Sequence, residues 1–136
     1  MKDIELLALA VKATEKSYSP YSDCRVGAAL LTKSGKVYTG TNIENAAFSP
    51  TVCAERVAFF KAVSEGEREF EKIAVVGGKN GEINGFFTPC GVCRQVMREF
   101  CDDDFIILLA DTTVTCKKTT LGELLPLSFS RKDVEG

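Results

Sequence analysis

The sequence predicts a layered α/β domain with a mixed sheet. Two observations lead to this prediction: a hairpin of two strand-like runs early in the chain, and an alternation of strands and helices through its second half. The chain has 136 residues, of which 45% are hydrophobic and 26% are charged, an ordinary composition for a folded protein. We therefore expect one domain over residues 1–136, with a core that needs no disulfides to fold.

The first half begins with a predicted helix over residues 4–13, where apolar side chains follow helical spacing and Asp3 is placed to cap the first turn. The stretch Ser19-Pro20-Tyr21-Ser22 breaks this helix. Residues 26–31 and 36–43 are then predicted to be two strands joined by the turn Thr32-Lys33-Ser34-Gly35.

The second half alternates helices and strands. A helix is predicted over residues 53–65, with Ala54, Val57, Ala58 and Ala62 on one stripe, and a second helix over residues 91–100. The apolar run 73–76 is typical of a buried strand and residues 77–88 of a loop, and further strands are predicted over residues 105–110 and 114–117. Thr120 is expected to cap a short helix that ends at Leu125-Pro126.

Charge and hydropathy exclude several classes of partner. The formal net charge is −2, which argues against duplex DNA held through its phosphates. No apolar stretch approaches the roughly 20 residues of a membrane span, and Lys2, Asp3 and Glu5 precede any apolar run, so no signal peptide is expected. The sequence thus predicts a cytoplasmic protein with no nucleic-acid or membrane partner.

The absence of histidine restricts the possible chemistry. With no imidazole, serine–histidine and cysteine–histidine catalysis and histidine-liganded metal sites are excluded. Protons must be moved by carboxylates, lysine, tyrosine, cysteine or metal-bound water. The six cysteines, without a secretory segment, are then expected to be metal ligands or core residues.

Two short patches carry the predicted chemistry. One surrounds Cys53, at the start of a predicted helix, and the other contains Cys90 and Cys93, at the start of the next. Three thiolates would give zinc three protein ligands and leave its fourth position for water, as in catalytic zinc sites. Helix N-termini favour thiolate over thiol, and zinc lowers the pKa of a bound water to about 7.

Glu55 and Arg56 follow the first of these cysteines. Glu55 is close to the predicted metal but is not needed as a ligand, so it is the strongest candidate to move protons between the water and a substrate. Three thiolates on Zn²⁺ leave a formal charge of −1, which Arg56 could offset by donating hydrogen bonds to the sulfurs.

Each feature has a simpler alternative. Cys-x-x-Cys also occurs in thioredoxin-like redox pairs and in structural zinc sites closed by a fourth cysteine, for which the chain offers Cys24, Cys101 and Cys116. Cys101 is expected about two turns beyond Cys93 on one helix, too far to join the site, and lone cysteines are usually small core residues. Taken alone, Glu55 and Arg56 would be read as a solvated helix face.

Together the two patches resemble a known zinc family. Cys53-Ala54-Glu55 followed by Pro89-Cys90-Gly91-Val92-Cys93 is the pattern of the zinc nucleobase deaminases. The chain resembles the small cytidine deaminases with three cysteine ligands, from about Tyr18 to Phe129. The matching stretches, in order, are Tyr18 to Ser22, Val26 to Leu30, Gly40 to Ala46, Cys53 to Arg56, Pro89 to Gln95, and Leu124 to Pro126.

The resemblance implies a fold, an activity and further site residues. The fold would be a three-layer α/β/α sandwich with a mixed five-stranded sheet, in a homotetramer with shared active sites and one zinc ion per chain. By resemblance, Asn42 and Glu44 bind the ribose hydroxyls and Ala54 contacts the base through its backbone. Phe129 matches an aromatic residue that reaches a neighbouring subunit's site. Without the resemblance, Asn42 and Glu44 would be read as a polar loop and Phe129 as a core residue.

One departure from the family pattern concerns base stacking. The family commonly carries a stacking aromatic two residues before the Val-Gly-Ala-Ala strand, where this chain has Cys24. Stacking is then expected from Phe48 or Phe129, or the affinity for the base is lower. Phe48 itself replaces the tyrosine often found there.

The activity implied is hydrolytic deamination of cytidine and 2′-deoxycytidine in pyrimidine salvage, by attack of zinc-bound hydroxide at C4 with Glu55 as the proton carrier. A deaminase of aminonucleoside antibiotics would share the zinc patches, but the stretch Asn42-Ile43-Glu44-Asn45 favours the cytidine branch. A polynucleotide deaminase would need a basic surface that carries aromatic residues for binding single strands, whereas this chain is acidic overall, so that activity is not favoured. A non-catalytic zinc module is opposed by Glu55 beside an open coordination position.

Overall fold

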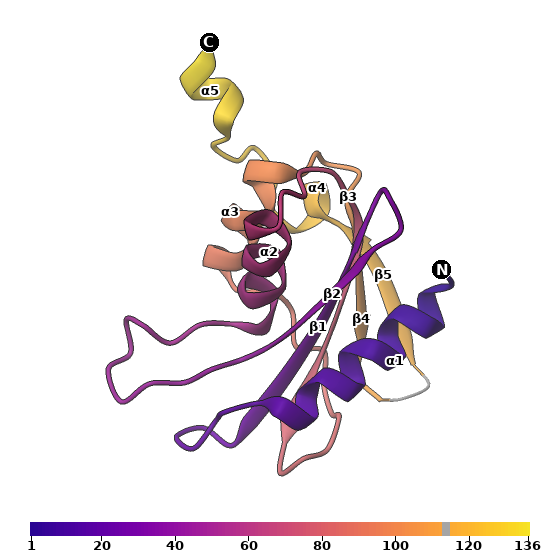
Figure 1. The fold of residues 1–136 in the computed structure, drawn as a ribbon, viewed down its shortest axis with the longest axis vertical. Coiled ribbons are helices and arrows are strands. Elements are labelled where there is room, and N and C mark those ends of the chain that lie inside the picture. The colour runs from indigo at the N-terminus through magenta and orange to yellow at the C-terminus, as the bar shows by residue number, and fades with distance from the viewer. Residues whose placement is uncertain (113–114) are drawn as a thin grey trace.

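A twisted mixed sheet forms the centre of the molecule (Figure 1). The computed structural model describes residues 1–112 and 115–136. The five strands lie in the order β2-β1-β3-β4-β5, in which β3 and β4 are parallel and every other neighbouring pair is antiparallel. The strands are β1 (Cys24–Thr32), β2 (Val37–Thr41), β3 (Phe70–Lys79), β4 (Ile106–Ala110) and β5 (Cys116–Thr120).

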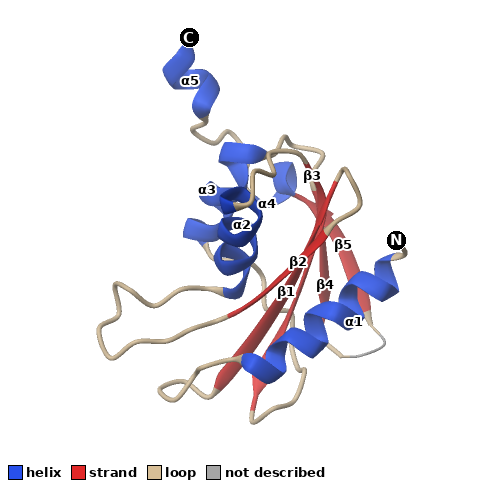
Figure 2. Ribbon diagram, viewed as in Figure 1, coloured by secondary structure: helices blue, strands red, loops and turns tan. Residues whose placement is uncertain are grey.

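Helices cover both faces of this sheet (Figure 2). Helix α1 lies on one face, whereas α2 and α3 lie side by side on the other. This arrangement confirms the predicted three-layer α/β/α sandwich with a mixed five-stranded sheet. The helices are α1 (Asp3–Ala13), the 3-10 turn η1 (Thr14–Lys16), α2 (Ala54–Ser64), α3 (Gly91–Phe100), α4 (Leu121–Leu124) and α5 (Arg131–Glu135).

The core is divided into two apolar layers by the central strands. Because successive side chains of a strand point to opposite faces, Ile73 and Val75 of β3 pack under α2 and α3, whereas Ala74 and Val76 pack under α1. All four side chains have no exposed surface. This two-sided burial explains why residues 73–76 form a continuous apolar run.

Several predicted boundaries are wrong by a few residues. Helix α1 begins at Asp3, so Lys2 occupies the capping position, and its backbone N–H donates to the Glu5 carboxylate at 3.1 Å. The helix ends at Ala13, as predicted. Strand β3 includes Gly77, Gly78 and Lys79, which were predicted to be loop.

At the C-terminal end, the strand predicted over 114–117 is found over Cys116–Thr120, and Val114 lies outside the described residues. Thr120 caps the short helix α4 as predicted, with its hydroxyl accepting from the Glu123 N–H at 3.3 Å. Helix α5 was not predicted.

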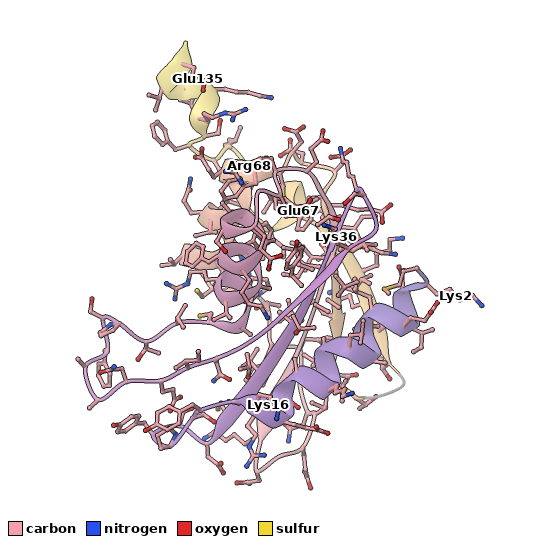
Figure 3. The ribbon with its side chains drawn as sticks, viewed as in Figure 1. Lys2, Lys16, Lys36, Glu67, Arg68 and Glu135 are labelled. Carbon is pink, nitrogen blue, oxygen red and sulfur yellow. The ribbon has the colours of Figure 1, made fainter. Side chains whose placement is uncertain are left out.

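The C-terminal helix projects from the body of the molecule (Figure 1). In Figure 3, Glu135 lies on α5, which stands away from the sheet, whereas Lys36 and Glu67 approach each other near the β1–β2 turn, at 3.9 Å. Within residues 1–112 and 115–136, no helix is both long and apolar enough to cross a membrane.

Candidate metal centre and active site

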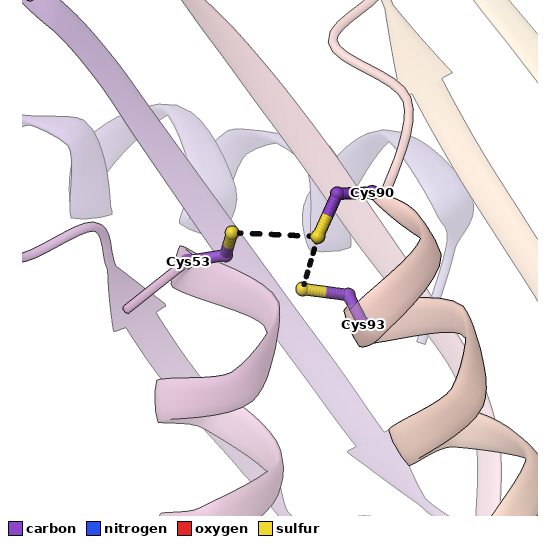
Figure 4. A group of neighbouring side chains, drawn as sticks. All are labelled: Cys53, Cys90 and Cys93. Atoms are coloured by element: carbon purple, nitrogen blue, oxygen red, sulfur yellow. Dashed lines mark hydrogen bonds between the residues drawn. The ribbon is translucent and has the colours of Figure 1, made fainter. Parts of the chain in front are cut away.

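Three cysteine sulfurs meet between the first turns of α2 and α3 (Figure 4). Cys53 is the residue before α2, Cys90 is the residue before α3, and Cys93 lies in the first turn of α3. The Sγ atoms of Cys53 and Cys90 are 3.7 Å apart, and those of Cys90 and Cys93 are 3.5 Å apart. The fold therefore joins two patches that are 37 residues apart in sequence.

This sulfur triangle has the dimensions of a zinc site. With Zn–S bonds of about 2.3 Å, tetrahedral coordination places neighbouring sulfurs roughly 3.8 Å apart. All three sulfurs lie within 4.8 Å of one another, so they fit one zinc ion and supply three of its four ligands. Cys93 is buried whereas Cys90 is exposed, so the triangle has an inner and an outer side.

Arg56 provides positive charge beside the sulfurs. Its Nη2 donates to the Sγ of Cys53 at 3.6 Å, and its Nε is buried without a hydrogen-bond partner among the described residues. The pKa of Cys53 falls to about 5 because its sulfur accepts hydrogen bonds, first from Cys93 and then from Arg56. The same contact with Cys53, together with burial, raises the pKa of Cys93. Without metal, the centre thus stabilises a thiolate on Cys53, while Cys93 is held as the thiol that donates to it. A metal ion would need Cys93 to lose this proton as well.

Glu55 is buried beside these cysteines and is not part of a solvated helix face. Its relative exposure is 4%, although it lies in the first turn of α2. Burial raises the pKa of Glu55 to about 7, and the negative charge of Cys53 adds to this rise, while a hydrogen bond with its own backbone N–H opposes it. A buried carboxyl with a pKa near neutrality is suited to accept and return a proton.

Gly40 sets how closely α2 approaches the sheet. A Cβ at this position of β2 would lie 2.3 Å from the Ala54 carbonyl oxygen and 2.6 Å from the Ala58 backbone nitrogen. Only glycine therefore lets the first turns of α2, which carry Glu55, lie directly on the sheet.

Asn42, the residue after β2, connects to the start of β1 and to Ser17, which precedes β1. Its Oδ1 accepts from the Ser17 hydroxyl at 2.6 Å and from the Val26 N–H at 2.9 Å, while its Nδ2 donates to the Cys24 carbonyl at 2.8 Å. The side chain is nearly buried, at 9% exposure. Three of its four hydrogen-bonding positions are thus used within the protein, and one N–H is left.

Glu44 is held by the turn that follows Ser19. Its Oε1 accepts from the backbone N–H groups of Tyr21 and Ser22, at 2.9 and 3.2 Å, and its Oε2 accepts from the Ser22 hydroxyl. These bonds, that of the Ser22 hydroxyl first, lower the pKa of Glu44. Glu44 is therefore a fixed carboxylate at neutral pH.

The remaining candidate residues lie in different environments. Ala54 is fully buried as the first residue of α2, where a backbone N–H has no partner within the helix. Phe48 is 88% exposed and Phe129 is 63% exposed, so within one chain neither ring is packed into the core. Their predicted contacts with substrate would have to be made in an assembly or on ligand binding.

The other cysteines do not close the site. Among the described residues, the cluster consists of Cys53, Cys90 and Cys93, without Cys24, Cys101 or Cys116. Cys101 is buried one residue beyond the end of α3, and this burial raises its pKa to about 12. The closed four-cysteine alternative is thus not supported.

Sequence reasoning missed residues that support the site. Ser17 holds Asn42 and Ser22 holds Glu44. Ser17 has no distinguishing signal in the local sequence, whereas Ser22 lies in a stretch that matches the family but was given no role. Gly40 carried a signal that was not used, since a glycine inside a strand often marks close backbone approach.

Comparison with known proteins agrees with this geometry. Residues 1–109 match the family model described as "Cytidine and deoxycytidylate deaminase zinc-binding region". The chain is 48% identical to a cytidine deaminase of Sporosarcina psychrophila over 133 residues, covering 97% of this chain and 95% of the relative. It is 46% identical to a cytidine deaminase of Halalkalibacterium halodurans over 129 residues, covering 95% of each.

A solved structure shares the fold as well as the sequence. The crystal structure of a cytidine deaminase from Burkholderia pseudomallei superposes with a TM-score of 0.87 at 44% identity, covering 95% of this chain and all of that one. The matched zinc-binding region and the cysteine cluster support one zinc ion per chain. By sequence, fold and metal-site geometry, the chain belongs to the cytidine and deoxycytidylate deaminase family of zinc hydrolases.

Proposed function

We propose that this chain hydrolyses cytidine and 2′-deoxycytidine to uridine and 2′-deoxyuridine with release of ammonia, as a step of pyrimidine salvage. The observation that carries the proposal is a triangle of cysteine sulfurs with the buried Glu55 beside it. The three sulfurs leave one coordination position of a tetrahedral zinc ion for water, which a purely structural site would not need. The two curated relatives described above bear the name cytidine deaminase.

Cys53, Cys90 and Cys93 would hold the metal and Glu55 would move the protons. When bound, zinc lowers the pKa of a coordinated water to about 7 and so supplies the nucleophile for C4 of the pyrimidine. Glu55 would accept one proton of that water and deliver it to N3, and would then take the second proton from the oxygen newly bonded to C4 and deliver it to the departing 4-amino group. The C4–N bond breaks as the C4 carbonyl forms, so that water and cytidine become uridine and ammonia. Its pKa near 7 suits both directions of transfer.

Arg56 would balance the charge of the centre. Three thiolates around Zn²⁺ carry a formal charge of −1, which weakens the metal as a Lewis acid. The guanidinium of Arg56 donates to the sulfur of Cys53 and withdraws part of that charge.

Asn42 and Glu44 would bind the sugar. Asn42 keeps one free N–H, and Oε2 of Glu44, which accepts from Ser22, keeps room for a second donor. The N–H can donate to a sugar hydroxyl, and the carboxylate oxygen can accept from one.

Ammonia release from a small substrate panel tests the proposal. Cytidine and deoxycytidine should react, whereas adenosine should not and free cytosine should react about 10⁴-fold more slowly, because the polar groups of the sugar site would stay unpaired. Preferred turnover of a cytosine-bearing antibiotic would favour an aminonucleoside deaminase. No turnover of any compound by zinc-loaded protein would indicate a non-catalytic zinc module.

A substitution separates the sugar site from the metal chemistry. Glu44→Ala should reduce turnover of cytidine while leaving the slow reaction of cytosine nearly unchanged, since cytosine has no hydroxyl to bind. Equal losses on both compounds would show that Glu44 acts through the fold rather than through the sugar.

The metal ligands are tested by zinc content. Cys53→Ala, Cys90→Ala and Cys93→Ala should each lose zinc and activity together, whereas Cys24→Ala and Cys116→Ser should retain about one zinc per chain. A fourth cysteine essential for zinc binding would overturn the open-site assignment.

The proposed assembly is a cytoplasmic homotetramer in which Phe129 reaches a neighbouring site. Its support is the exposure of Phe48, Leu127 and Phe129, three large apolar side chains on the loop after β2 and on the C-terminal segment.

A further inference from the structure

Helix α3 is fastened to the C-terminal segment by side chains of one face. Arg94, Gln95 and Arg98 donate to the backbone carbonyls of Leu124, Phe129 and Leu125 respectively, at 2.7, 2.9 and 3.3 Å. Arg94 alone among these three also contacts the loop that enters the metal centre. Its Nε donates to the Pro89 carbonyl at 2.7 Å.

The Pro89 carbonyl belongs to the peptide bond that leads into Cys90. Cys90 has extended backbone geometry (φ −69°, ψ 169°) at the start of α3 and is exposed, so little packing restrains it. Cys93, in contrast, has 1% exposure and is held within the core. The hydrogen bond from Arg94 therefore restrains the backbone of Cys90, the exposed cysteine that packing does not hold.

The other end of the contact is firmly anchored. Leu124 is the last residue of α4, whose final carbonyls lack partners within the helix, and Leu121 of the same helix is fully buried. Both bonds of Arg94 are short, and the planar guanidinium fixes their relative direction. Arg94 thus connects the Cys90 loop to a packed part of the chain.

We propose that Arg94 is a positioning residue that holds Cys90 in place as a zinc ligand, by bridging the carbonyls of Pro89 and Leu124. The proposal rests on the zinc ligands of the proposed function. Arg94 does not act as a ligand itself. It helps to retain the metal by keeping the Cys90 sulfur in position to coordinate the same ion as Cys53 and Cys93. Residues that orient metal ligands commonly act in this way.

Zinc release to a chromophoric chelator tests this role in the full-length protein. Arg94→Gln should release zinc about 10–100-fold faster than the parent, the usual effect of losing a group that orients a ligand. Arg98→Gln is the control, because it makes the same change one turn later and loses contacts with Leu125 and with the Asp103 carboxylate, at 3.3 and 2.7 Å, but none with Pro89. It should release zinc at nearly the parent's rate.

A second readout separates positioning from general stability. Arg94→Gln should shrink the difference in unfolding midpoint between zinc-loaded and zinc-free protein, whereas Arg98→Gln should lower both midpoints together. Should Arg94→Gln fail to fold, Arg94→Lys, which can reach one carbonyl but not both in the same geometry, is expected to release zinc at an intermediate rate.

The outcomes distinguish the two proposals. A parent protein that binds no zinc would overturn the proposed ligand set itself. A parent that holds zinc, with equal release from the Arg94→Gln and Arg98→Gln variants, would leave the ligand set intact and refute the positioning role of Arg94.

Discussion

Replacing Gly40 by alanine should displace α2, which carries the proposed proton carrier Glu55, from the sheet. The added Cβ would lie 2.3 Å from the Ala54 carbonyl oxygen, whereas ordinary contact begins at 3.4 Å, so α2 must retreat by about 1 Å. Overpacking of this kind costs roughly 1–3 kcal/mol of stability. A displacement of about 1 Å at a catalytic group can reduce turnover by about 10²-fold.

The same substitution on the opposite face of the sheet is the control. A Cβ on Gly27 would lie 2.0 Å from the Ala10 carbonyl oxygen of α1, so Gly27→Ala should lose comparable stability without moving α2. Both variants are compared by thermal unfolding, zinc content and the kcat for cytidine, at a temperature where each is fully folded. Gly40→Ala should lose turnover and Gly27→Ala should not. Parent-like kcat in Gly40→Ala, or equal losses of kcat in both variants, would refute the argument that Gly40 seats Glu55.

Three further outcomes are expected. Glu55→Gln should keep its zinc and lose about 10²–10⁴-fold in kcat, because it removes proton transfer; turnover within a few-fold of the parent would assign the proton to another group. Asp3→Asn should lower the free energy of unfolding at pH 7 by roughly 0.5–1 kcal/mol, since the carboxylate, 38% exposed, pairs with Lys72 at 2.6 Å. The hydrogen bond from Lys72 lowers the pKa of Asp3 below 3.8, so this stability is present above about pH 4 and is lost as pH falls through the folded-state value; a difference that persists at pH 2 would contradict the pairing. Sedimentation should show a species well above 14.8 kDa, and Phe129→Ala should reduce cytidine turnover within it; a fully active monomer would refute shared sites.

The local sequence was sufficient to predict features that depend on neighbouring residues, namely helices, a helix cap and the candidate metal ligands. The helices at the start of the chain and after each cysteine patch follow from apolar periodicity, and Thr120 is found capping α4 as predicted. The ligand set could be proposed because sulfur chemistry and the absence of histidine leave few alternatives. Short spacing also predicted that Cys90 and Cys93 would share a helix start.

The tertiary structure decided what depends on contacts distant in sequence. Gly77 and Gly78 were assigned to a loop because glycine favours loops, yet both lie in β3, where a Cβ would meet the Phe87 ring and the Glu82 backbone. The burial that raises the pKa of Glu55 is likewise a property of the packed sheet and helices.

Hydrogen bonds between distant segments account for the rest. Nothing in the spacing of Asn42 reveals that it fastens Ser17, Cys24 and Val26, and nothing around Arg94 reveals that Leu124 is its partner. Local periodicity and residue chemistry thus determined the helices and the candidate ligands. Only the folded chain determined which backbone groups hold those ligands and the sugar-binding candidates in place, because these contacts join residues that the sequence keeps apart.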